Sequence, residues 1–178
     1  MKKTLLMAAV LLLTATFAHA QLGTGSATGQ LTLTVGPEAG LTVVTGTTTL
    51  TSVGTNFSPY TGPTSLTYFV RTTKTGGTGS IVLKVTTDFA GTGGPSVGTP
   101  PTAGDALKYT CTVSTPGTAC TGTQTASTSA TTPVATFGSD AHSTFAGNTA
   151  SVAWTLTNDP LYATGSYTAT VTYTIATP

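Results

Sequence analysis

Apolar and hydroxylated residues alternate along the last stretch of the chain, residues 165–175. Threonine fills the even positions from 168 to 174, and apolar residues fill the odd ones: Tyr167, Ala169, Val171, Tyr173 and Ile175. Successive side chains of a β-strand point to opposite faces, so this spacing predicts a strand with one apolar and one hydroxylated face. Such a strand needs a second apolar layer to pack against.

Shorter copies of this pattern recur along the chain between clusters of Gly, Pro, Asn and Asp. We expect further strands at residues 30–35, 41–53, 65–72, 81–89, 107–113, 134–137 and 150–157. Pro37 and Gly40 are expected to end the first of them, and residues 56–63 to form a loop. The glycines within residues 75–79 predict a hairpin turn. A loop as long as residues 90–104 is either functional or flexible, and its richness in Gly and Pro without a charged or aromatic anchor favours a flexible loop.

No helical periodicity follows residue 20. About eight or nine short strands, separated by regular turn signals, predict an all-β fold: an antiparallel, immunoglobulin-like β-sandwich forming a single domain at residues 30–178. The apolar rows of these strands supply the expected core residues: Leu66, Leu83, Trp154, Val171 and Tyr173.

The chain begins with the three parts of a secretory signal peptide. Lys2 and Lys3 are followed by an apolar run, and Ala18-His19-Ala20 provides a cleavage site. The run is too short for a membrane anchor, which needs roughly 20 apolar residues. We therefore expect residues 1–20 to be removed, residues 21–29 to form a flexible leader, and the protein to be secreted, either extracellular or at the cell surface. No membrane span is expected in the mature chain.

Charge is scarce in the expected mature chain. Four basic and five acidic residues remain after residue 20, a formal net charge of −1, and they form no cluster. This argues against nucleic acid or an anionic membrane as partner. Threonine, with 47 residues, supplies the polar surface instead, and its branched side chain favours extended backbone. A glycosylated threonine-rich stalk is the alternative, but these threonines alternate with apolar residues.

Cys111 and Cys120 are the only cysteines. In an exported protein they are expected to form a structural disulfide. The turn residues between them, 114–117, predict that they face each other within one hairpin. The rival, a redox site, needs closer cysteine spacing or a nearby activating base.

Candidate catalytic residues are few. His142 is the only histidine after the expected signal peptide, and it lies in the run Ser139-Asp140-Ala141-His142-Ser143. Sequence neighbours in an extended chain point apart, so this run predicts no Ser-His-Asp triad. Each of the four aspartates lies beside a turn, where aspartate bonds its own backbone: Asp88, Asp105, Asp140 and Asp159. We therefore expect no enzyme, no metal site and no cofactor.

Both ends of the chain resemble secreted pilin-like subunits of the chaperone–usher and spore coat U type. The resemblance rests on the alternating final strand, residues 165–175, and on the alternating segment after a soft leader, residues 27–35. It implies that the N-terminal segment fills a groove of a neighbouring subunit in place of a missing strand. The position of the cysteines, both in mid-chain, departs from that family, which usually has one cysteine early in the chain.

The sequence thus predicts a non-enzymatic structural or adhesive surface protein whose partner is another copy of itself or another surface protein. Leu31, Leu33 and Val35 are the candidate donor or edge strand. The alternative is a carbohydrate-binding module for polysaccharide, in which exposed Tyr60, Tyr68 or Tyr162 stacks on sugar rings.

We predict that the signal peptide, residues 1–20, is removed on export. Intact mass spectrometry of the exported protein should give a chain that starts at Gln21, because cleavage follows Ala20. An exported protein that retains residues 1–20 would contradict the signal peptide.

Overall fold

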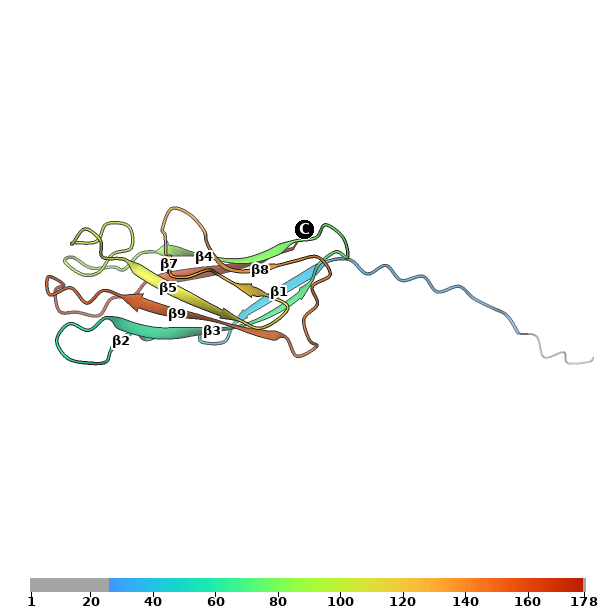
Figure 1. Ribbon diagram of the computed structural model, residues 1–178, viewed down its shortest axis with the longest axis horizontal. Coiled ribbons are helices and arrows are strands. Elements are labelled where there is room, and N and C mark those ends of the chain that lie inside the picture. The colour runs from blue at the N-terminus through green and yellow to red at the C-terminus, as the bar shows by residue number, and fades with distance from the viewer. Residues whose placement is uncertain (1–25, 178) are drawn as a thin grey trace, which may run out of the picture. The chain divides into compact units, whose positions relative to one another are not determined.

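The computed structural model describes residues 26–177, and the described chain contains ten β-strands and no helix. The strands form two antiparallel sheets with the hydrophobic core between them (Figure 1). The predicted all-β sandwich is confirmed. The strand count exceeds the expected eight or nine because three strands are only two residues long.

The larger sheet has the strand order β1-β3-β9-β5-β7, with β2 also paired to β3. Its members are β1 (Glu38–Val43), β2 (Thr51–Ser52), β3 (Tyr60–Arg71), β5 (Leu107–Val113), β7 (Gln124–Thr125) and β9 (Asn148–Leu156). The smaller sheet has the order β10-β4-β8-β6. It consists of β4 (Gly79–Thr87), β6 (Thr118–Ala119), β8 (Thr132–Phe137) and β10 (Thr170–Ala176).

The core is built from the alternate residues of the long central strands. In β3 and β9 every second side chain is buried, as the period of a strand requires. Leu66, Leu83 and Trp154 are fully enclosed, whereas Val171 and Tyr173 are only partly buried at its margin. All five predicted core residues therefore contact the core, but those of the last strand lie at an edge.

Both predicted hairpins are wrong, because the chain crosses between the sheets at each of these turns. Residues 72–78 connect β3 of the larger sheet to β4 of the smaller one, and residues 114–117 connect β5 to β6 in the same way. Each strand instead pairs with strands from elsewhere in the sequence, as β3 does with β9. Turn residues show where the chain reverses, but not which sheet it enters next.

Two residues expected to interrupt strands lie inside them. Gly40 is in β1 opposite Phe69, and Pro63 is in β3 opposite Ala153. On the other side of β3, strand pairing with β1 covers residues 66–71 and pairing with β2 covers residues 60–61. Pro63 lies between these two stretches, where its missing N–H breaks no strand pairing.

The Gly- and Pro-rich loop at residues 90–104 has the charged anchor that the sequence did not reveal. Asp88 accepts hydrogen bonds from the backbone N–H groups of Phe89, Val97 and Gly98 at 2.7–2.9 Å and from the Ser96 hydroxyl at 2.7 Å. Burial opposes ionisation of this carboxyl, but the four donors outweigh it and lower its pKa below the ordinary value.

An aromatic side chain from the far end of the sequence completes this anchorage. The Tyr167 ring lies against Gly94, where a Cβ atom would come within 2.0 Å of the ring. The Tyr167 hydroxyl donates to the Ala163 carbonyl at 2.7 Å, and the Ala163 N–H donates to the Gly93 carbonyl at 2.7 Å. Tyr167 therefore packs on this loop and lies outside β10, which begins only at Thr170.

We predict that Asp88→Asn lowers the free energy of unfolding at pH 7 by about 1–3 kcal/mol, since an amide replaces a carboxylate that accepts four hydrogen bonds. A carboxyl with a lowered folded-state pKa stabilises the fold above its unfolded pKa, and this contribution disappears as pH falls through the folded value. Denaturant melts from pH 7 down to pH 2 should therefore show the difference between wild type and variant shrinking below about pH 4.

Asp140→Asn is the matched control. Asp140 is exposed, and asparagine tolerates its left-handed backbone, φ 58°. Equal destabilisation by both variants, or an Asp88→Asn effect independent of pH, would contradict the anchoring role.

Candidate functional site

The two long sides of the sandwich differ in how they are closed. One side is fastened by the disulfide between Cys111 in β5 and Cys120 just after β6, with the two Cα atoms 5.5 Å apart. Because β5 and β6 belong to different sheets, the disulfide joins the sheets and does not lie within a hairpin. The predicted cysteine pair is thus correct, and its predicted hairpin setting is wrong.

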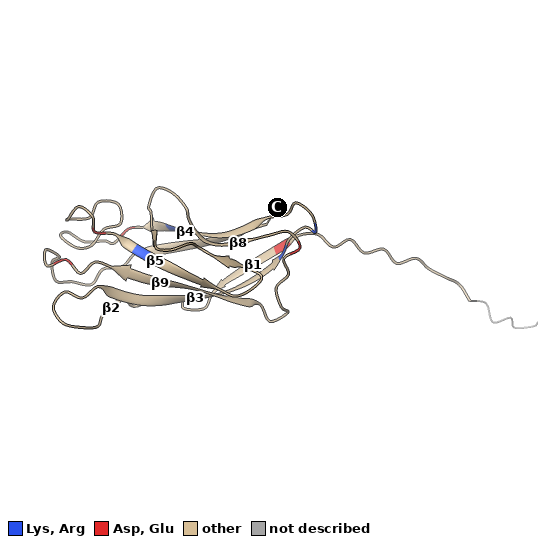
Figure 2. Ribbon diagram, in the orientation of Figure 1, with Lys and Arg blue, Asp and Glu red and all other residues tan. Residues whose placement is uncertain are grey.

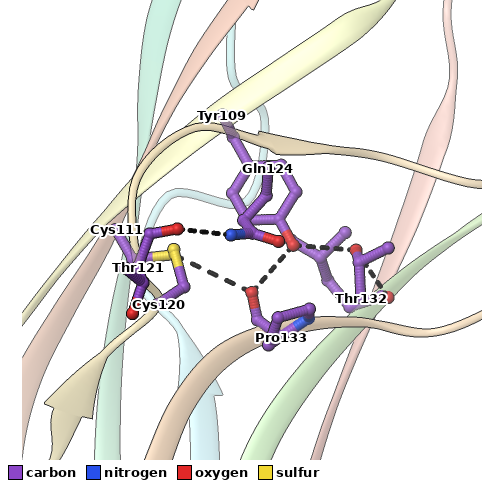
Figure 3. The surroundings of a disulfide bond; sticks show 8 residues. Tyr109, Cys111, Cys120, Thr121, Gln124, Thr132 and Pro133 are labelled. Carbon is purple, nitrogen blue, oxygen red and sulfur yellow. Dashed lines mark hydrogen bonds between the residues drawn. A yellow bond between two sulfur atoms is a disulfide. The ribbon is translucent and has the colours of Figure 1, made fainter.

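Hydrogen bonds reinforce the fastened side (Figure 3). The Tyr109 hydroxyl of the larger sheet lies 2.8 Å from both the Thr132 hydroxyl and the Pro133 carbonyl of β8. Farther along, the Tyr68 hydroxyl donates to the Ser114 carbonyl and accepts from the Gly117 N–H at 3.1 Å. Burial raises the pKa of both tyrosines, so both stay neutral donors.

The opposite side is bounded by β1 and β10, which are neighbours across the sandwich. Each is the last strand of its sheet, so within the described chain its outer edge has no paired strand. Unpaired N–H and C=O groups on such edges are available to another strand. We call this side the open edge.

Apolar side chains of the open edge point inward but remain partly uncovered. In β1, Leu41 and Val43 stand opposite the buried residues Tyr68 and Leu66, and Val43 is 41% exposed. In β10, the partly buried residues Val171, Tyr173 and Ile175 stand opposite buried residues of β4. The hydrophobic layer between the sheets is therefore incompletely covered along this side.

Tyr173 has an unusual environment within the open edge. Its hydroxyl is buried and makes no hydrogen bond to any described residue, although Thr64 and Trp154 lie nearby. Those two are already engaged, since the Trp154 Nε1–H donates to the Thr64 hydroxyl at 2.9 Å and Thr64 also bonds Thr48 at 2.6 Å. Burial is the main cause that raises the pKa of Tyr173 to about 12.

The expected N-terminal strand does not form within residues 30–35. This segment has no paired residues, and its apolar side chains are open to solvent: Leu31 is 97%, Leu33 81% and Val35 60% exposed. Alternation alone does not make a strand, because a strand also needs an edge to pair with. The chain thus carries an unpaired alternating segment as well as the open edge. The predicted signal peptide and most of the leader lie outside the described residues.

The serine, aspartate and histidine side chains of residues 139–143 do not form a catalytic triad, as the sequence predicts. His142 Nε2 lies 3.0 Å from Asp140 Oδ1, and both side chains are more than half exposed. The Ser143 hydroxyl accepts from the Val70 N–H at 2.9 Å, and the Ser139 hydroxyl donates to the Gly77 carbonyl at 3.1 Å. Both serines are therefore used by the backbone and not by the histidine.

The carboxylates at the opposite end of the strands also have structural partners. Asp159 accepts from the Thr102 hydroxyl and from the Leu161 N–H at 2.8 Å, and these donors lower its pKa. The Tyr162 hydroxyl donates to Asp105 at 3.0 Å, and burial together with this carboxylate raises the pKa of Tyr162. Within residues 26–177, no group of three or more His, Cys, Asp or Glu side chains is placed to hold a metal ion.

The three tyrosines of the alternative sugar-stacking platform are all at least half-buried. Tyr68 is fully buried, and Tyr60 and Tyr162 are half-buried. The exposed aromatic side chains of the described chain are instead Phe57, Phe69 and Phe145. Sequence patterns did not identify them, because Phe57 lies within the expected loop at residues 56–63 and Phe69 lies on the face of its strand opposite to the core residue Leu66.

Comparisons with protein-family models, curated proteins and solved structures found no match. Among the described residues, no helix has the length and apolar character needed to cross a membrane.

We predict opposite effects for removing two buried tyrosine hydroxyls. Tyr68→Phe should lower the free energy of unfolding by about 1–3 kcal/mol, because it leaves the Ser114 carbonyl and the Gly117 N–H without their partner. Tyr173→Phe should be neutral or stabilising, because its hydroxyl is desolvated without a hydrogen bond. Denaturant melts of the two single variants make the comparison, and a clear loss of stability in Tyr173→Phe would disprove the unpaired hydroxyl.

Proposed function

We propose that this protein is a structural subunit of a surface assembly in which residues 30–35 of one copy add as a strand to the open edge of another. The single observation that carries the proposal is that one chain has both an open edge and an exposed alternating segment of matching character. In this function the protein is exported and non-enzymatic, and its partner is a second copy of itself or another surface protein.

Strand addition would provide backbone partners both for residues 30–35 and for the open edge. A strand placed at the open edge receives main-chain hydrogen bonds, and its alternate side chains enter the apolar layer. Leu31, Leu33 and Val35 would point inward toward Val43 and Val171, while the threonines between them stay in solvent. Each leucine fully buried in this way contributes roughly 1.5–3 kcal/mol.

The geometry of the proposed contact favours a chain of subunits. The donating segment and the accepting edge are different surfaces, so the contact is heterologous and leaves a free donor and a free acceptor at the two ends. Such contacts give open filaments when the rotation does not close. This agrees with the resemblance of both chain ends to pilin-like subunits.

Export is supported by the disulfide, which is typical of proteins that fold in oxidising compartments. A non-enzymatic role is supported by the contacts of the candidate catalytic side chains. Asp88 and Asp159 bond backbone N–H groups, and Ser139 and Ser143 contact backbone groups instead of His142.

The test compares two substitutions in the donating segment. Leu33→Asp places a carboxylate in the apolar layer of the neighbour, which costs several kcal/mol, so assembly should be lost. Thr32→Asp adds the same charge on the solvent side of the donated strand and should still assemble. Light scattering measures the size of each mature protein, and melting curves show whether the subunit still folds.

The expected result is an assembled wild type, an assembled Thr32→Asp variant and a monomeric Leu33→Asp variant that still melts cooperatively, at a temperature lowered only by the lost contact between subunits. A wild type that is monomeric, or equal loss of assembly in both variants, contradicts strand donation. A monomeric wild type whose Leu33→Asp variant melts earlier indicates that the segment completes its own subunit.

A further inference from the structure

The outer face of the larger sheet carries an ordered array of hydroxyl groups. Leu66 and Ala150 point into the core, so their neighbours in β3 and β9 point outward. Register places Thr67 opposite Thr149, and Ser65 opposite Ser151, which in turn pairs with Thr112. A shallow hollow of about 290 Å³ lies over this array. It is lined by Val44, Leu66 and Ala150 and by six residues with hydroxyl groups: Ser65, Thr67, Thr112, Ser114, Thr149 and Ser151.

Most of these hydroxyls are free to bind a ligand. Ser114 and Thr149 bond each other at 2.7 Å. The side chains of the other four make no hydrogen bond to a described residue, so each offers one donor and two acceptor positions. No charged residue lines the hollow (Figure 2 shows how sparse charges are on the strands). The hollow thus combines free hydroxyl groups with apolar surface and no charge, which fits a neutral ligand that has both hydroxyl groups and apolar C–H faces.

An aromatic ring lies beside the array. Phe69 follows Thr67 on the same face of β3 and is 39% exposed. Its ring is held against Gly147, where a Cβ atom would come within 2.9 Å of the ring and 2.7 Å of the Thr67 methyl group. Gly147 also has a left-handed backbone, φ 83°, so both its conformation and its missing side chain permit this packing.

We propose that this hollow binds a neutral saccharide. Hydroxyl groups of the sugar would exchange hydrogen bonds with Ser65, Thr112 and Ser151, and the apolar C–H face of a sugar ring would rest on Phe69. An anionic saccharide would find no cationic side chain in the lining, and a purely apolar ligand would leave the hydroxyl groups without partners.

Two observations separate this hollow from another hollow of the described chain and from the open edge. A second hollow, of about 730 Å³ beside Gly79 and Thr136, is lined by Phe137, but that ring is only 2% exposed, whereas the Phe69 ring beside the saccharide hollow is 39% exposed. The saccharide hollow lies on the outer face of the larger sheet, whereas the apolar side chains of the open edge point into the sandwich. A donated strand and a saccharide would thus contact different faces of the sandwich, so we expect a subunit in an assembly to keep saccharide binding.

The experiment is affinity electrophoresis of the mature protein in gels that contain one polysaccharide each. The neutral probes are hydroxyethylcellulose, soluble starch, laminarin and galactomannan, and carboxymethylcellulose is the anionic counterpart of the first. The Leu33→Asp variant is tested beside the wild type, so that assembly and saccharide binding are measured separately. Retardation by at least one neutral probe is expected in both proteins.

Two substitutions on β9 locate the site. Ser151→Leu fills the hollow and removes a central hydroxyl, and it should weaken binding about tenfold, the cost of one or two lost hydrogen bonds. Thr155→Leu is the matched control, because Thr155 is exposed on the same face of the same strand but does not line the hollow. Phe69→Ala should also weaken binding, with the fold checked by melting.

Retardation by a neutral probe that Ser151→Leu weakens about tenfold and Thr155→Leu preserves supports the proposal. No retardation by any of the four neutral probes overturns it. Retention that both leucine variants leave unchanged, or stronger retention by carboxymethylcellulose than by hydroxyethylcellulose, overturns it as well.

Discussion

The two sheets of this sandwich are fastened along one side only. On that side a disulfide and the Tyr109 hydroxyl connect strands of different sheets. On the other side, β1 and β10 end their sheets with unpaired edges, and partly exposed Val43 and Tyr173 mark the margin of the core. The proposed assembly depends on that opening.

Sequence patterns identified most strands because burial on one face imposes a period of two. Residues 107–113 were predicted with the bounds that β5 has, and Cys111 and Cys120 were correctly paired. Pairing partners were not predictable, because a turn such as residues 114–117 serves equally within a sheet and between sheets. The N-terminal segment shows the same limit, since an alternating row at Leu31 and Leu33 does not reveal whether a partner strand exists.

The loop anchors were missed for a different reason. Asp88 precedes the loop it holds, and Tyr167 follows it by about seventy positions, so neither is recognisable from the composition of residues 90–104. Alternation with Leu66 already places Phe69 on the outer face of its strand, but the hydroxyl groups beside it come from neighbouring strands that the alternation does not reveal. The candidate sites of this protein are thus made by contacts between distant segments, and single-segment patterns contain little information about them.

The central claim is that assembly fills the open edge with a strand, and amide hydrogen exchange measured by mass spectrometry tests it most directly. The comparison is between the wild-type assembly and the monomeric Leu33→Asp variant. The account predicts that assembly slows exchange in three segments together: residues 30–35, β1 and β10. Exchange at β6 and β7, on the fastened side, should remain the same in both samples. Protection confined to other strands, or no change at β1 and β10, would contradict the account.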